Sequence, residues 1–145
     1  MGNHIKNYRK DYELPAAVDK WGWRFHHLGI PTTRQLRGEK YIKGLKMFVT
    51  GFDTSPYGIE WMRFEEDSPI SEIVKTIPHL AFEVEDIEKA IEGKNILTDV
   101  HTISEGIKVA MILDNDAPVE LLEFSTGKQQ KFLPGPESAK NNLII

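Results

Sequence analysis

Apolar and polar residues alternate along most of the chain, and this pattern predicts a largely β structure. Strands are expected where aromatic and aliphatic residues alternate with other residues between turn-forming glycine, proline and aspartate. Seven such segments occur, at residues 21–32, 46–52, 59–64, 78–84, 98–104, 107–113 and 119–124.

Helical patterns are fewer and shorter. Asp86 stands at an N-cap position before apolar residues at Ile87, Ala90 and Ile91, a spacing that predicts a helix. A short helix is also expected at residues 32–39, and one or two helical turns after Ser68 and Pro69. The second half therefore has the order β-α-β-β-β, and the first half fits the same order less cleanly.

The two halves also repeat in sequence, which is typical of a duplicated structural unit. His27-Leu28-Gly29-Ile30 corresponds to His79-Leu80-Ala81-Phe82, and the segment 58–64 corresponds to 118–124. We therefore expect one domain built from two modules between two terminal segments. The expected boundaries are an N-terminal extension 1–20, a domain 21–125 with modules 21–66 and 77–125 and linker 67–76, and a C-terminal tail 126–145.

Each half supplies one histidine and one glutamate at matching places: His27 and Glu60, then His79 and Glu120. Strand alternation puts these four side chains on one face, among mostly apolar neighbours. An ionisable group on an apolar face is costly unless it is paired or binds a cation. Taken singly, such residues are more often packing histidines or solvent-facing glutamates. Their occurrence in register in both halves favours a shared metal.

The composition narrows the chemistry of such a site. With no cysteine in 145 residues, any metal must be held by nitrogen and oxygen ligands. Two imidazoles and two carboxylates suit a divalent ion such as Zn²⁺, Ni²⁺, Co²⁺, Mn²⁺ or Fe²⁺. The net charge of −4 and the scattered basic residues argue against a nucleic-acid partner. No apolar segment is long enough to cross a membrane, and the start lacks a leader pattern, so a cytoplasmic protein is expected.

At these residues the chain resembles the vicinal oxygen chelate superfamily, closest to its glyoxalase and methylmalonyl-CoA epimerase branches. The segment His79–Ile87 is similar to the family's strand leading into a helix, and Val119–Glu123 to its closing strand. The resemblance implies an α+β fold in which two βαβββ modules form a curled mixed sheet around a central cleft. It also implies a homodimer, and a metal held by His27, Glu60, His79 and Glu120, either within one chain or between two.

The resemblance implies an enzyme, a lyase or isomerase, that transfers a proton next to a carbonyl group of a small-molecule substrate such as a thiol conjugate or thioester. Glu120, sharing the role with Glu60, is the expected general base. The predicted substrate pocket consists of Trp23, Phe25, Met62 and Phe64.

Two alternatives remain open at this point. The first is a binding or resistance protein of the same fold that holds a small molecule without turning it over. The second is an Fe²⁺ extradiol-type dioxygenase, which is less favoured because Glu60 would occupy a position that oxygen needs.

Overall fold

The computed structural model describes residues 8–104 and 106–124, and eight strands and four short helices lie within these ranges. The strands are β1 Arg24–Pro31, β2 Lys40–Ile42, β3 Met47–Thr50, β4 Ile59–Phe64, β5 His79–Glu83, β6 Asn95–Ser104, β7 Ile107–Asp114 and β8 Ala117–Phe124. The helices are α1 Ala16–Asp19, the 3-10 helix η2 Lys43–Leu45, α2 Glu72–Thr76 and α3 Ile87–Ala90.

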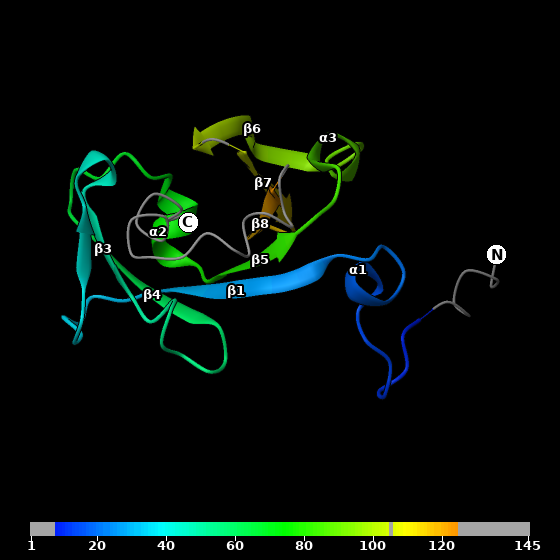
Figure 1. The fold of residues 1–145 in the computed structure, drawn as a ribbon, viewed down its shortest axis with the longest axis horizontal. Helices are drawn as coiled ribbons and strands as arrows, with labels where there is room; N and C mark the ends of the chain where they lie inside the picture. Colours follow the sequence, from blue (N-terminus) through cyan, green and yellow to red (C-terminus); the bar gives the residue numbers. More distant parts are fainter. Residues whose placement is uncertain (1–7, 105, 125–145) are drawn as a thin grey trace.

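All eight strands belong to one sheet with the order β2-β3-β4-β1-β5-β8-β7-β6. Each half repeats the same arrangement: β1 pairs in parallel with β4, and β5 in parallel with β8. The halves join where β1 and β5 run antiparallel. The two ends of the sheet rise on the same side of β1 and leave α2 between them (Figure 1). The predicted α+β class with a curled mixed sheet is confirmed.

All seven predicted strands are present, with ends shifted by a few residues. The sequence did not predict β2, which has only three residues and a charged neighbour on its N-terminal side. Antiparallel pairing with β3 holds it in the sheet. Such a short edge strand depends on its partner more than on its own residue pattern.

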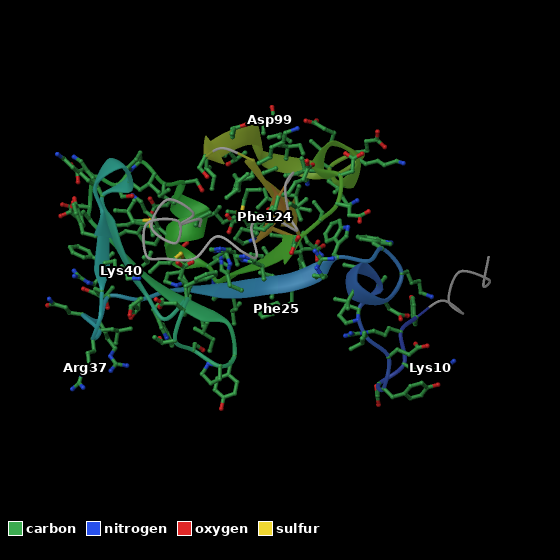
Figure 2. The ribbon with its side chains drawn as sticks, viewed as in Figure 1. Lys10, Phe25, Arg37, Lys40, Asp99 and Phe124 are labelled. Carbon is green, nitrogen blue, oxygen red and sulfur yellow. The ribbon has the colours of Figure 1, made fainter. Side chains whose placement is uncertain are left out.

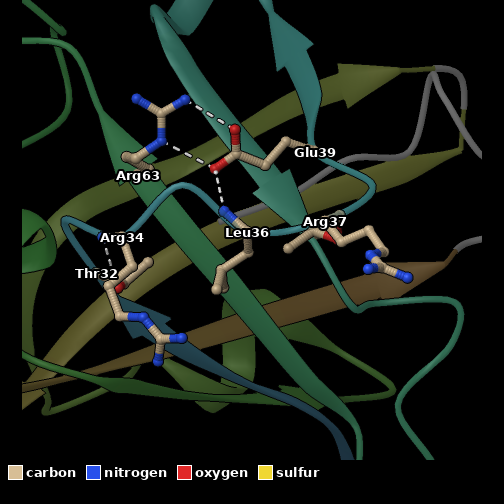
Figure 3. Close-up of polar contacts among 7 residues, drawn as sticks. Thr32, Arg34, Leu36, Arg37, Glu39 and Arg63 are labelled. Carbon is tan, nitrogen blue, oxygen red and sulfur yellow. Dashed lines mark hydrogen bonds and ion pairs between the residues drawn. The ribbon is translucent and has the colours of Figure 1, made fainter.

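The short helix predicted at residues 32–39 is wrong, because this segment is an irregular connection with a turn at Gly38. The carboxylate of Glu39 accepts two hydrogen bonds from the guanidinium of Arg63, at 2.7 and 2.8 Å, and one from the backbone N–H of Leu36 at 3.3 Å (Figure 3). The Arg63 guanidinium holds the pKa of Glu39 below its ordinary value. This forked ion pair joins the connection to β4, so a long-range contact replaces local helix formation.

The predicted helical turn after Ser68 is present as α2, and it lies on the inner face of the curl (Figure 1). Val74 of α2 is buried in a cluster with Met47, Val49, Met62 and Met111. Met62 is two residues from Glu60, and Met111 pairs in register with Glu120, so α2 packs on the face that carries the candidate ligands.

The predicted helix after Asp86 is present as α3 and covers the outer face of the second half. The Asp86 side chain caps the helix by accepting the backbone N–H of Lys89, and Glu123 accepts the N–H of Ile87 at 2.9 Å. Ile87 is fully buried against Phe82 and its neighbours.

The N-terminal extension predicted for residues 1–20 is described from residue 8 onward, where α1 adds Val18 to the cluster under α3. Residues 1–7 of the extension and the predicted tail 126–145 lie outside the described residues. Within the described ranges the longest helix has five residues, far short of the roughly 20 needed to cross a bilayer.

Candidate metal centre

The four candidate ligands lie on the four central strands, where the two halves of the sheet meet. His27 and His79 belong to β1 and β5, and Glu60 and Glu120 to the parallel neighbours β4 and β8. All four side chains are buried, with at most 1% of the residue surface exposed. One chain therefore supplies all four residues to one place.

Register explains how the duplicated strands bring these side chains together. Gly29 pairs with Glu60 in the first half, and Ala81 pairs with Glu120 in the second. Across the central junction, His27 pairs with Ala81. In each half the histidine therefore lies two residues before the partner of the glutamate: His27 precedes Gly29, and His79 precedes Ala81.

Polar atoms of the four side chains approach one another closely. Nε2 of His27 lies 3.5 Å from Oε1 of Glu60 and 3.4 Å from Oε1 of Glu120. Nε2 of His79 lies 3.1 Å from the same Glu120 oxygen. His27, His79 and Glu120 form the tightest group, each offering a ligand atom within 4.8 Å of the others. Glu60 borders this group through its contact with His27.

The residues fit a divalent cation by two independent observations. Four buried atoms, one from each side chain, have no hydrogen-bond partner: Nε2 of His27, Oε1 of Glu60, Nδ1 of His79 and Oε2 of Glu120. Two ligands held about 2.1 Å from one ion are separated by about 3.0–3.4 Å. The separations of 3.1–3.5 Å match that spacing.

The two carboxyl groups differ in their proton affinity. Burial raises the pKa of Glu60 well above its ordinary value, and the charge of Glu120 raises it further. Burial acts in the same direction on Glu120, but the adjacent imidazoles of His27 and His79 outweigh it and lower the pKa of that carboxyl. In the metal-free cluster Glu120 is therefore the more readily ionised of the two carboxyl groups.

A β-bulge sits beside this cluster. The pairing of β1 with β5 shifts register between Phe25 and His27. Nδ1 of His26 consequently lies 2.8 Å from Nδ1 of His27. Burial and the neighbouring His27 lower the pKa of His26 to about 4, although Glu120 acts to raise it. Simple strand alternation would instead place His26 on the opposite face from His27.

Two small residues make room for the imidazole rings, a feature that the sequence analysis did not assign. A Cβ added to Gly29 would lie 2.2 Å from Cε1 of His79. Ala81, fully buried, occupies the equivalent position opposite His27. The signal was present in the sequence, since both halves read histidine, leucine and then a small residue.

The four residues predicted to form the substrate pocket divide between both faces of the sheet. Trp23 and Phe25 lie on the outer face, Trp23 against Phe82 with 5.7 Å between ring centroids. Figure 2 shows Phe25 on the opposite side of β1 from Phe124. Regular strand alternation would put Phe25 on the same face as His27, and the structure differs because the bulge between them reverses the alternation.

Met62 and Phe64 share the face of the cluster, where both contact the core under α2. Substrate binding by the four predicted pocket residues stays a prediction. The position of Trp23 and Phe25 on the outer face does not support a pocket role for these two residues.

A cavity of about 370 Å³ lies beside Glu120, between α2 and the second half of the sheet. Glu120 is part of its wall, together with Ser71, whose buried hydroxyl oxygen has no hydrogen-bond partner. The other lining residues are mostly apolar: Leu45, Pro69, Ile70, Val74, Thr98, His101, Ile103, Val109, Ala110 and Met111. The sequence did not predict this cavity, because it forms only when the linker folds into the curl.

Comparison with known proteins shows the fold and no specific activity. No protein-family model and no curated protein matches the sequence. Among solved structures, the hypothetical protein BH1468 from Bacillus halodurans C-125 is 18% identical with a TM-score of 0.52, over 70% of this chain and 94% of that one. Methylmalonyl-CoA epimerase from Mycobacterium tuberculosis is 17% identical with a TM-score of 0.47, over 81% of this chain and 91% of that one. The chain therefore shares its overall fold with the Bacillus halodurans protein.

The close contact at Gly29 generates a first prediction. Gly29→Ala should displace the His79 ring and weaken Zn²⁺ affinity by about tenfold or more. Gly44→Ala is the matched control, because an added Cβ there meets nothing within 4 Å and Gly44 has no left-handed φ. Titration with a competing chelator measures both affinities. Equal affinities for the two variants would contradict the proposed place of His79.

The raised pKa of Glu60 predicts a pH dependence of metal-free stability. A carboxyl group whose pKa is higher in the folded state than in the unfolded state stabilises the folded state at pH values below its unfolded pKa. This stabilisation is lost as the pH rises through the folded pKa. Glu60→Gln keeps position 60 uncharged at every pH, so the stability of this variant relative to wild type should grow above pH 4.5, by up to about 1.4 kcal/mol per pH unit until the folded pKa of Glu60 is passed. Thermal unfolding in chelator at several pH values measures this. Glu92→Gln, an exposed control, should follow wild type, and a Glu60→Gln curve parallel to wild type would refute the shift.

Proposed function

We propose that this protein is a metal-dependent enzyme that moves a proton on a carbon next to a carbonyl group. The observation that carries the proposal is the buried cluster of two imidazoles and two carboxyl groups. Its nitrogen and oxygen atoms lie 3.1–3.5 Å apart, and each side chain also has a buried polar atom without a hydrogen-bond partner. A buried polar group without a partner costs stability, so a site with four of them points to a bound cation. The sequence resemblance to glyoxalase and epimerase branches supports this class of chemistry.

In this proposal His27, His79 and Glu120 are the principal ligands of a divalent ion. They form the tight group, and Glu120 is the carboxylate held ionised by both imidazoles. A bound divalent ion would supply a Lewis acid that stabilises negative charge on a substrate oxygen and favours the ionised form of Glu60.

Glu60 is the better candidate for the proton carrier, with Glu120 as its neighbour in the cluster. The Glu60 carboxyl contacts the tight group of His27, His79 and Glu120 through His27. Burial and the nearby charge of Glu120 raise its pKa and so favour proton binding. The ionised Glu60 carboxylate would take the proton from the substrate carbon while the C–H electrons move toward the carbonyl oxygen. The same carboxyl then returns the proton to a carbon of the substrate, which completes an isomerisation without any net change of charge.

The cavity beside Glu120 indicates the kind of substrate. A volume of about 370 Å³ suits a small molecule, and most of its lining side chains are aliphatic. The described lining residues include neither lysine nor arginine, so a free carboxylate on the substrate would lack a lysine or arginine partner in the cavity wall. We propose a neutral aliphatic carbonyl compound or acyl thioester, with the reacting carbon at the Glu120 end.

An oxygenase is the second candidate, because the tight group alone is a set of two histidines and one carboxylate. Such a set with open positions is typical of non-haem Fe²⁺ oxygenases. Oxygen uptake by the Fe²⁺-loaded protein with a catechol would favour this candidate. Bound metal without oxygen uptake and without proton exchange would favour a small-molecule binding protein.

The homodimer and the cytoplasmic location remain predictions from the sequence.

Paired glutamate variants test the division of roles. Glu60→Gln should keep Zn²⁺ affinity within about tenfold of wild type yet lower the rate of α-proton exchange by about 10²-fold or more. Glu120→Gln should lose metal affinity as well as rate, because it removes the carboxylate between both imidazoles. Metal titration and deuterium incorporation from D₂O, followed by NMR, give the two readouts. If the metal-loaded Glu60→Gln variant retains the wild-type rate, Glu60 is not the proton carrier.

A substrate panel tests the cavity. With the metal-loaded protein, deuterium should enter short aliphatic acyl thioesters and neutral ketones at least about tenfold faster than thioesters with a free carboxylate, such as methylmalonyl thioesters, because the described lining has no lysine or arginine. Hemithioacetals complete the panel. Preference for the thioester with a free carboxylate would contradict the assignment of this cavity, while the metal assignment would stand.

A further inference from the structure

His26 contacts one of the proposed ligands from the side away from the cluster. Its Nδ1 atom lies 2.8 Å from Nδ1 of His27, while Nε2 of His27 faces Glu60 and Glu120. An imidazole nitrogen is either a protonated donor or an acceptor. Two Nδ1 atoms at this distance therefore share one proton, and one ring donates to the other.

The direction of that hydrogen bond decides whether His27 can bind a cation. If Nδ1 of His27 donates, a neutral His27 ring has a free electron pair on Nε2, which points into the cluster. If Nδ1 of His26 donates instead, the neutral His27 ring carries its proton on Nε2 and cannot act as a ligand there. Histidine ligands usually donate their second ring N–H to a fixed acceptor, and here that acceptor is a second imidazole.

The fold holds the His26 ring in the accepting position. The register shift between Phe25 and His27 brings His26 next to His27 instead of leaving it on the opposite face. The ring then lies between Phe52 and Phe124, at centroid distances of 5.2 and 5.7 Å and tilted by 33° to each. Aromatic packing on two sides limits rotation of the ring and so fixes the direction of its Nδ1 atom.

We propose that His26 is a positioning residue that accepts the Nδ1–H of His27 and thereby keeps Nε2 of His27 free to bind a divalent ion. This inference rests on the proposed metal function of His27, and it adds a residue that touches neither metal nor substrate. It also gives the β-bulge a role, since an unbulged β1 would separate the two rings.

Two substitutions at position 26 separate the hydrogen bond from aromatic packing. His26→Phe keeps a ring between Phe52 and Phe124 but removes the acceptor, and it should weaken Zn²⁺ affinity by about 10- to 100-fold. His26→Asn loses the ring but offers an amide oxygen near the place of Nδ1, and it should stay within about threefold of wild type. A purely structural role predicts the reverse order, because the phenyl ring preserves the packing. Chelator competition measures affinity, and thermal unfolding checks that each variant is folded.

The protonation state of His27 gives a test that needs no substitution. In ¹⁵N-labelled wild-type protein loaded with Zn²⁺, NMR should show His27 protonated at Nδ1 and His26 protonated at Nε2 only. A proton on Nδ1 of His26 in that state would overturn the inference, as would wild-type affinity in His26→Phe. Wild-type protein that binds no divalent ion would instead overturn the proposed function, so the two failures are distinguishable.

Discussion

The structure depends on one constraint: two carboxyl groups and two imidazoles are buried together at the junction of the two half-sheets. Each contributes a buried atom without a hydrogen-bond partner. Such atoms are costly in an apolar interior, and no described contact satisfies them. A divalent cation would take a ligand atom from each of the four side chains, which no single hydrogen bond can do.

The duplicated topology makes this convergence possible. Antiparallel pairing of β1 with β5 sets the two histidines on opposite sides of the junction, and the parallel neighbours β4 and β8 bring one glutamate to each. The rings fit because Gly29 and Ala81 are small. The approximate symmetry is then broken by chemistry, since Glu120 contacts both imidazoles and Glu60 only one. That asymmetry gives one carboxyl the character of a ligand and the other that of a proton carrier.

The sequence was sufficient for the features that follow from local pattern, and insufficient for those set by distant contacts. Strand alternation and the repeat of histidine and glutamate predicted the sheet and placed His27 and Glu60 on one face. The bulge could not be predicted, because a one-residue register shift beside two adjacent histidines leaves no mark in the alternation. The connection at residues 32–39 is irregular because Glu39 pairs with Arg63 of a distant strand. The cavity depends on the linker folding onto the inner face through Val74.

The central claim is that both imidazoles and the Glu120 carboxylate bind one ion. X-ray absorption spectroscopy at the metal edge of the Zn²⁺-loaded protein, with the ion present at one equivalent per chain, tests this most directly. The account predicts a first shell of nitrogen and oxygen atoms at about 2.0–2.2 Å, with the outer-shell scattering of two imidazole rings. A first shell without imidazole scattering, or an ion that remains hydrated in solution, would contradict it.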